Sequence, residues 1–335
     1  METNGDVTVK VVPVRHVGRW IGAVVALVLV AMLVHTLFSK VPSGQYVCQT
    51  VNGLRHCHPK LQWRFYWNVV GRYFTSSEIL HGLGLTLLLT AISMTVGIVL
   101  GILIAVMRLS SNRVLAMTAW SYTWFFRGTP VYAQLFFWFF LSFLFKSISF
   151  GIPFTHVAFY HLHTVSFFTP FRAALVAFGL NEGAYMSEIA RSGLMAVDEG
   201  QVEAAKSLGM TRGQTLRLVI LPQAMRVIIP PTGNEVISML KTTSLAAAIS
   251  AVELLGAATQ ISNSNYQIMP LLIVAGIWYL IVTTILSIGQ FYVERHYARG
   301  ALRTPPPTPI QRLRSDLRGV LSKVHTKRVP AGMSP

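Results

Sequence analysis

Residues 79–107 read ILHGLGLTLLLTAISMTVGIVLGILIAVM, a run of apolar residues without a single Asp, Glu, Lys or Arg. A hydrocarbon core about 30 Å thick needs about 20 apolar residues in one helix, so this run is long enough to cross a membrane. The sequence therefore predicts an all-α, polytopic membrane protein with about six transmembrane helices. The other five apolar runs lie at about residues 20–38, 131–145, 171–187, 226–250 and 270–292.

The composition supports a membrane protein. Of the 335 residues, 53% are hydrophobic and 12% are charged, and the mean hydropathy is +0.52. A soluble domain has about 25% charged residues. The net charge is +16, but the basic residues lie between and after the apolar runs rather than in one patch. That distribution is typical of cytoplasmic membrane loops, and we expect no nucleic-acid partner.

The positive-inside rule predicts the topology. With the N-terminus inside, the segments on the cytoplasmic side hold most of the 28 Lys and Arg residues. Six spans then return the C-terminus to the cytoplasm, so we expect a multi-pass protein of the plasma membrane with both termini inside. The loop of residues 39–78 opposes this assignment, because it places five basic residues outside.

We divide the chain into three parts. Residues 1–78 comprise a cytoplasmic segment, an anchor span and an extracytoplasmic loop. The main membrane domain covers residues 79–295, and residues 296–335 form a basic tail with a Pro-Pro-Pro run that we expect to be disordered. The first apolar run has a basic leader like a signal peptide, but it is long and ends without a small-residue cleavage site, which favours a retained anchor.

The loop of residues 39–78 holds both cysteines of the chain, Cys48 and Cys57. An oxidising exterior favours a disulfide between them. His56 and His58 flank Cys57, but consecutive positions rarely share one metal ion, so we expect no metal site.

Proline and glycine residues predict interruptions. Pro130 disfavours helix at Thr129, so residues 114–126 are predicted to lie along the membrane interface as a separate helix. Pro230-Pro231 and Gly233 are predicted to break the fifth span. In the second span, Gly97 and Gly101 are four residues apart, a spacing that lets helix backbones approach each other.

Residues 203–222 read EAAKSLGMTRGQTLRLVILP and predict a helical hairpin. Glu203 to Leu208 is strong helix-forming sequence, and Gly209 can end that helix with a positive φ. A second, Arg-rich helix begins at Thr211 and is predicted to stop at Pro222. Such an exposed hairpin suits docking into a partner's groove; the alternative is a plain amphipathic connector.

The spacing of this hairpin resembles the EAA loop of ABC importer permeases. The resemblance implies a type I importer core in which the hairpin is the coupling helix that fits a cleft of the ATPase subunit. It assigns this coupling role to Glu203, Ala204, Ala205, Gly209 and Pro222.

Three further segments resemble polar amino acid permeases: FRGTPVYAQLF at 126–136, NEGAYMSEIAR at 181–191 and PTGNEVISMLKTTSL at 231–245. The resemblance covers residues 80–295. The family has five spans, so the anchor span and the basic tail depart from it. The implied function is the permease subunit of an ABC importer for polar amino acids, or for an opine or another small zwitterion.

The resemblance also implies the partners. The chain has no G-x-x-x-x-G-K-[ST] phosphate loop, so we expect no enzymatic activity and no bound cofactor. ATP and Mg²⁺ belong to a partner ATPase dimer. A second permease copy, an extracytoplasmic substrate-binding protein, the amino acid and membrane lipid complete the set. A secondary transporter would have no reason to carry the hairpin, and a membrane enzyme would need a convergent acid, base or metal set.

Ionisable residues at membrane depth mark functional sites. Glu182, beside Asn181, is predicted to meet the cationic group of the substrate, or alternatively to pair with Lys241. Glu235 follows the predicted break in the fifth span and is a second candidate for the pathway. Lys241 is assigned either to a substrate carboxylate or to a structural ion pair.

Overall fold

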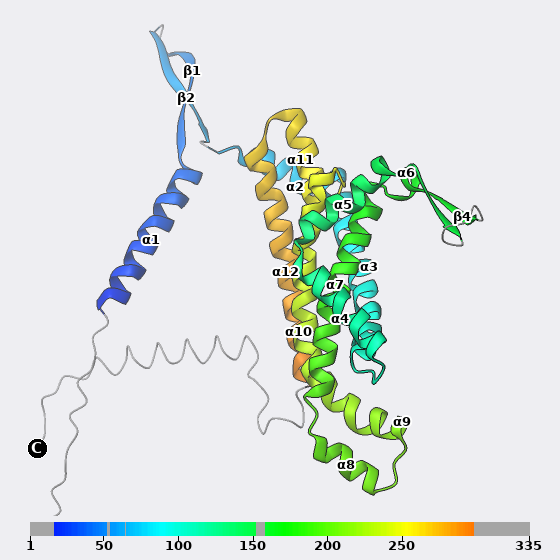
Figure 1. The fold of residues 1–335 in the computed structure, drawn as a ribbon. Coiled ribbons are helices and arrows are strands. Elements are labelled where there is room, and N and C mark those ends of the chain that lie inside the picture. Colours follow the sequence, from blue (N-terminus) through cyan, green and yellow to red (C-terminus); the bar gives the residue numbers. More distant parts are fainter. Residues whose placement is uncertain (1–16, 52–53, 64, 152–157, 298–335) are drawn as a thin grey trace, which may run out of the picture. The chain divides into compact units, whose positions relative to one another are not determined.

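The computed structural model describes residues 17–51, 54–63, 65–151 and 158–297 (Figure 1). The predictions for the first 16 residues and for the tail beyond Tyr297 lie outside the described residues. The chain separates into two compact units, one ending at Phe74 and the other beginning at Thr75.

The first unit contains helix α1 (Val17–Phe38), an antiparallel hairpin of β1 (Lys40–Val51) and β2 (Leu54–Trp63), and helix α2 (Trp67–Phe74). The hairpin returns the chain to its starting point, because Lys40 lies opposite Trp63. Trp67 then fastens α2 to the end of α1. Its indole N–H donates to the carbonyl of Leu37 at 3.0 Å, and its ring stacks on Phe38 with centroids 4.8 Å apart.

The strand register places Cys48 directly opposite Cys57. Opposite residues of antiparallel strands have Cα atoms about 4.5–5.5 Å apart, which is within the range that a disulfide spans. We therefore expect a Cys48–Cys57 disulfide in the protein isolated from membranes. Alkylation with and without reductant, read by mass spectrometry, checks it. Two alkylated thiols in the unreduced protein would contradict the prediction.

The second unit is a helical bundle with one further β-hairpin (Figure 1). Among the described residues, three helical stretches are long and apolar enough to cross a membrane: Ser77–Arg108, Arg212–Asn265 and Ile268–Tyr297. Gly22–Phe38 and Val131–Leu144 are shorter apolar helices. The helical membrane fold is confirmed, and the number of six spans stays a prediction. The elements in chain order are α3 (Ser77–Arg108), α4 (Arg113–Gly128), α5 (Val131–Leu144), β3 (Ser147–Gly151), β4 (Ala158–His163), α6 (Thr164–Phe167), α7 (Pro170–Met195), α8 (Glu199–Ser207), α9 (Arg212–Thr215), a π-helical turn (Leu216–Ile220), α10 (Leu221–Thr242), a 3₁₀ segment (Thr243–Ile249), α11 (Leu254–Asn265) and α12 (Ile268–Tyr297).

Helices α3 and α7 form the centre of the bundle, and glycines bring them together. A Cβ atom at Gly97 would lie 2.5 Å from Cγ of Glu182, and one at Gly101 would lie 2.5 Å from Cβ of Met186. Real Cβ atoms do not approach other atoms this closely, so only glycine fits at these positions. The close approach predicted for Gly97 and Gly101 is therefore a contact within one chain, and it sets the depth of Glu182.

The structure contains the separate helix predicted before Pro130, because α4 ends at Gly128. Its position along the membrane interface stays a prediction. Helix α4 packs against α7: the Tyr122 hydroxyl donates to the carbonyl of Leu180 at 2.6 Å, and Thr123 and Ser187 share a hydrogen bond at 3.4 Å. Buried hydroxyls in a membrane need partners, and α7 provides them in the C-terminal half of α4. Helices α4 and α5 thus form one broken segment of the bundle.

The structure corrects the predicted break in the fifth span. Helix α10 continues through Pro230 and Pro231 although both lack an N–H. Packing against α7 and α12 holds the helix together. The Gln290 side chain of α12 lies over Gly233, where a Cβ would come within 2.7 Å of it, and its amide donates to the carbonyl of Pro230 at 3.2 Å. Gly233 therefore makes room for a neighbouring helix rather than for a break.

Candidate functional site

The predicted hairpin is present as α8, a glycine turn and α9. Helix α8 ends in a Schellman motif, in which Gly209 donates to Lys206 at 2.9 Å and Met210 donates to Ala205 at 3.1 Å. Gly209 has φ +74°, as the sequence predicted. Ala205 is buried, whereas Glu203 and Ala204 are exposed. The hairpin therefore presents a rigid, largely exposed edge to a partner.

The second arm differs from the prediction. Thr211 caps α9 in a capping box with Gln214, but the helical chain does not stop at Pro222. A π-helical turn connects α9 to α10, and Pro222 lies in the first turn of α10. Proline is tolerated there because the N–H of that turn needs no helical partner. The hairpin therefore leads without interruption into α10.

Glu182 lies on α7 against Gly97 and is only 3% exposed. Its Oε1 atom has no hydrogen-bond partner among the described residues. Lys241, the alternative partner, is exposed, and the ion pairs of the described residues do not include it. Glu235 on α10 is half-buried and interacts electrostatically with Glu182. The carboxylates of Glu182 and Glu235 are thus close enough to interact electrostatically, whereas Lys241 forms no ion pair with either among the described residues.

Asn181 supports the break between α4 and α5. Pro130 has no N–H, so the carbonyl of Phe126 loses its helical donor. The side-chain amide of Asn181 donates to this carbonyl at 2.8 Å, and that of Gln134 donates to it at 2.9 Å. Gln134 also donates to Thr129 Oγ1 at 2.8 Å. Asn181, which we expected in the substrate pathway, and Gln134, which sequence reasoning overlooked, together hold the break beside α7.

We expect Asn181→Leu to destabilise the protein by about 1–3 kcal/mol, because the substitution removes one of the two donors at a half-buried carbonyl. Thermal unfolding of the purified protein measures the effect. Asn263→Leu, on an exposed position of α11, is the control and should change stability little. Equal losses in the two variants would contradict the role of Asn181.

Arg127 is the functional candidate that sequence reasoning passed over. It ends the last turn of α4 just before the break, and its guanidinium carbon lies 5.2 Å from the ring centroid of Tyr185. It also interacts electrostatically with Glu235. An arginine between two apolar helices was the available signal, since such residues are rare in membrane segments.

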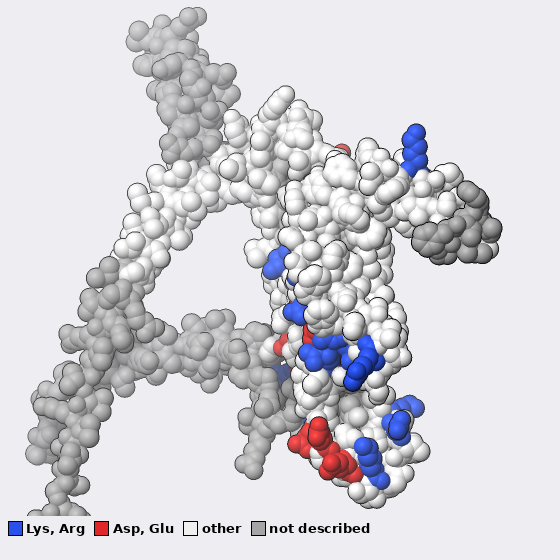
Figure 2. Space-filling view, in the orientation of Figure 1, with Lys and Arg blue, Asp and Glu red and all other residues white. Residues whose placement is uncertain are grey.

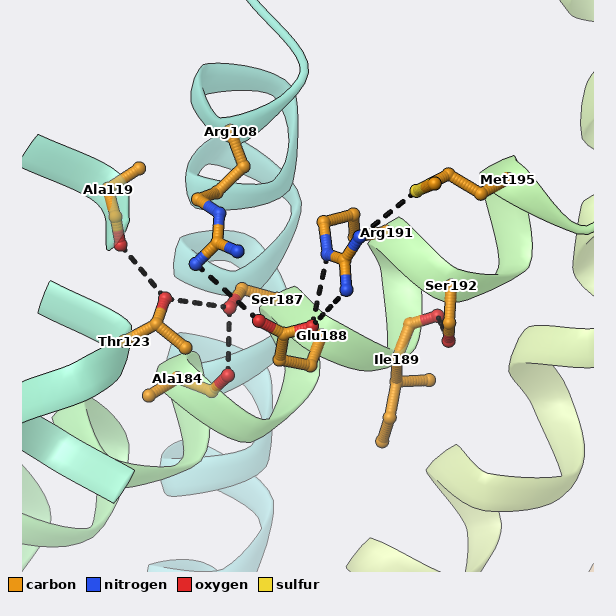
Figure 3. Close-up of polar contacts among 10 residues, drawn as sticks. All are labelled: Arg108, Ala119, Thr123, Ala184, Ser187, Glu188, Ile189, Arg191, Ser192 and Met195. Atoms are coloured by element: carbon orange, nitrogen blue, oxygen red, sulfur yellow. Dashed lines mark hydrogen bonds and ion pairs between the residues drawn. The ribbon is translucent and has the colours of Figure 1, made fainter. Parts of the chain in front are cut away.

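Figure 3 shows a cluster of three charged side chains, Arg108, Glu188 and Arg191. Glu188 accepts two hydrogen bonds from Arg191, at 2.8 and 3.0 Å, and forms an ion pair with Arg108 at 3.5 Å. Thr123 and Ser187 lie beside it in the same view. Glu188 therefore has both of its carboxylate oxygens occupied by arginines from α3 and α7.

A cavity of about 410 Å³ lies beside Glu188. Its lining includes Arg108, Arg127, Tyr185 and Glu188, with the indoles of Trp120 and Trp124 stacked 6.2 Å apart at one wall. The cavity combines two cations, one neutralised carboxylate and aromatic surfaces, which suits a small polar solute with an anionic group.

Comparison with known proteins also indicates a membrane transport protein. Residues 97–299 match the family described as binding-protein-dependent transport system inner membrane component. The arginine transport system permease protein ArgU of Corynebacterium glutamicum is 43% identical over 87% of this chain and 84% of its own length. The L-cystine transport system permease protein TcyB of Bacillus subtilis is 38% identical over 70% of this chain and 92% of its own length.

Two solved structures of ABC transporters are similar to this chain. A chain of an amino acid ABC transporter crystallised with histidines has 34% identity and a TM-score of 0.55, with 65% of this chain and 94% of that chain covered. The MetNI methionine ABC transporter has 18% identity and a TM-score of 0.54 over 66% of this chain and 97% of that chain, a likeness of fold. The exposed hairpin, the packed bundle and these matches together show that the chain belongs to the binding-protein-dependent transport system inner membrane components, the membrane permease subunits of ABC importers, in which a separate subunit hydrolyses ATP.

Proposed function

We propose that this permease imports a polar amino acid whose cationic group meets Glu182 and Glu235 within the membrane. The buried, unpartnered oxygen of Glu182 is the observation that carries the proposal. An unpaired carboxylate in an apolar interior is costly, so a cation that arrives with the substrate is a natural partner. The relatives with known substrates support the class, because their names include arginine and cystine transport.

The partners follow from the hairpin. An ATPase dimer holds ATP and Mg²⁺ and receives the edge formed by Glu203, Ala204 and Gly209. A second permease copy completes the pathway, and an extracytoplasmic binding protein delivers the amino acid. The exposed side chains around the turn support this docking, since Leu208 is 82% exposed beside Gly209.

The distribution of charge supports the proposed orientation. Figure 2 shows basic side chains gathered on the part of the bundle nearest the α8–α9 hairpin, and both acidic and basic side chains on the hairpin itself. Arg108 ends α3 and Arg113 begins α4 on this side, and Arg191 lies about one turn before the end of α7. By the positive-inside rule this end faces the cytoplasm. The protein is then a multi-pass component of the plasma membrane with both termini inside.

An opine is the second candidate substrate. The nopaline transport system permease protein NocM of Agrobacterium fabrum is 37% identical over 65% of this chain and 89% of its own length. An opine carries more than one carboxylate, so it would bring an additional negative charge to the cavity that Arg127 lines.

Uptake by the reconstituted importer tests the proposal. The permease, its ATPase subunit and its binding protein are placed in proteoliposomes and supplied with single radiolabelled solutes: arginine, lysine, glutamine, glutamate, cystine and nopaline. We expect ATP-dependent uptake of at least one polar amino acid. Uptake without ATP would indicate a secondary transporter. Exclusive uptake of nopaline would select the opine alternative.

A further inference from the structure

We propose that Arg127 receives the α-carboxylate of the substrate and thereby distinguishes an amino acid from the corresponding amine. The inference rests on the proposed function and adds the anionic half of the site to the cationic half at Glu182 and Glu235. Three observations carry it: the position of Arg127 beside the break between α4 and α5, the lack of an ion pair to it among the described residues, and the cavity beside it.

The position of Arg127 in the fold is set by the break between α4 and α5. Helix α4 begins at Arg113 and ends at Gly128, and a rise of 1.5 Å per residue puts Arg127 about 21 Å from the start of the helix. Arg127 therefore lies far along the helix from Arg113, beside the break that Asn181 and Gln134 support.

Within the described residues the Arg127 guanidinium has no carboxylate bonded to it. The ion pairs of the described residues join Arg108 and Arg191 to Glu188, and neither includes Arg127. Arg127 contacts the ring of Tyr185, which holds the side chain over α7 while its donors stay available. Arg127 is exposed in the protomer. A guanidinium presents donors that match a carboxylate in a bidentate pair.

Glu235 places the opposite charge nearby. It interacts electrostatically with both Arg127 and Glu182, and the ion pairs of the described residues do not join it to Arg127. A zwitterion with its carboxylate at Arg127 and its cationic group toward Glu235 and Glu182 satisfies both ends. An anion alone would leave the two carboxylates uncompensated.

The cavity gives the carboxylate a place. Arg127 lines the cavity of about 410 Å³ together with Tyr185 and the two indoles of α4. Arg108 also lines it but is bonded to Glu188, whose oxygens are both occupied. Arg127 is therefore the cation in this cavity whose donors remain available, and the break after it, held by Asn181 and Gln134, fixes where those donors point.

Competition between arginine and agmatine, which is arginine without its carboxylate, tests the inference. The permease–ATPase complex is placed in nanodiscs without its binding protein, so that the receptor's own selectivity does not enter. We expect the wild-type complex to bind agmatine at least about tenfold more weakly than arginine. In Arg127→Gln, arginine binding should fall to the level of agmatine. Arg127→Lys should keep part of the discrimination, because Lys keeps the charge and loses the bidentate geometry.

The control is Arg113→Gln, which removes the same charge at the other end of the same helix and should leave the discrimination unchanged. If the uptake panel selects another amino acid, that amino acid and its decarboxylated amine form the probe pair. Discrimination that persists in Arg127→Gln would overturn the inference, and so would a wild-type complex that transports yet binds no amino acid. Loss of bound anionic phospholipid in Arg127→Gln with intact discrimination would assign the residue to lipid instead. Failure of the proposed function is separate, because the wild-type importer would then take up no amino acid.

Discussion

We expect the permease with Gly209→Asp to insert and fold but no longer to co-purify with its ATPase subunit, and ATP-driven uptake to be lost. This is the result that we expect from the geometry of the α8–α9 turn. Gly209 lies at φ +74°, and a Cβ atom there would meet nothing within 4 Å. The fold therefore has room for the new side chain, and Asp is among the residues that tolerate a positive φ, at a cost in backbone strain. We expect the effect at the partner instead, because the carboxylate would project from the tip of the proposed docking edge beside Leu208.

Two variants separate the causes. Gly209→Asn has nearly the same size and the same tolerance of positive φ as Asp, so a milder loss in that variant would assign part of the effect to charge. Gly213→Asp introduces the same charge four residues away, at an exposed glycine whose Cβ also meets nothing within 4 Å. It should retain the ATPase subunit. Normal co-purification of Gly209→Asp, with normal transport, would exclude the hairpin as the coupling element.

The second large effect concerns Glu182. We expect Glu182→Gln to lower uptake of the preferred amino acid by about tenfold or more, because a cationic group then loses its charged partner in a low-dielectric interior. The melting temperature should stay unchanged or rise, since an unpaired buried carboxylate is itself destabilising. Uptake in proteoliposomes and thermal unfolding of the same preparation measure the two quantities.

Lys241→Met serves as the companion variant. The structure gives Lys241 no ion pair with Glu182, so the two substitutions should act additively on stability in a double-mutant cycle. A large stability loss in Glu182→Gln that Lys241→Met reverses would restore the ion-pair alternative. Undiminished uptake by Glu182→Gln for every accepted amino acid would remove Glu182 from the pathway.

The sequence was sufficient to predict those structural features that depend on neighbouring residues alone. The predicted run of residues 79–107 is α3 almost to the residue, because continuous apolar sequence leaves few alternatives in a membrane. The positive φ of Gly209 was also predictable, since strong helix-forming sequence ends at a glycine. Both features depend on the residues themselves and their immediate neighbours.

The predictions from sequence failed where packing against another helix determines the local structure. Pro230 and Pro231 predicted a break, and Pro222 predicted a stop, but packing from α7 and α12 keeps α10 helical. The pairing of the Asn181 amide with the Phe126 carbonyl joins residues far apart in the sequence, and no spacing rule indicates it. Arg127 was overlooked for the same reason, because its distance from Tyr185 and its proximity to Glu235 exist only in three dimensions.

The return of the β1–β2 hairpin to its own base has a consequence for how such a chain can change. Because Lys40 and Trp63 lie opposite each other, residues between them can be added or removed in cross-strand pairs without moving the ends that join α1 to α2. Each added pair extends the hairpin by about 3.3 Å, and lengthening a closed excursion adds little to the entropy of joining its ends. The length of the β1–β2 hairpin can therefore change in evolution while its connections to α1 and α2 stay the same.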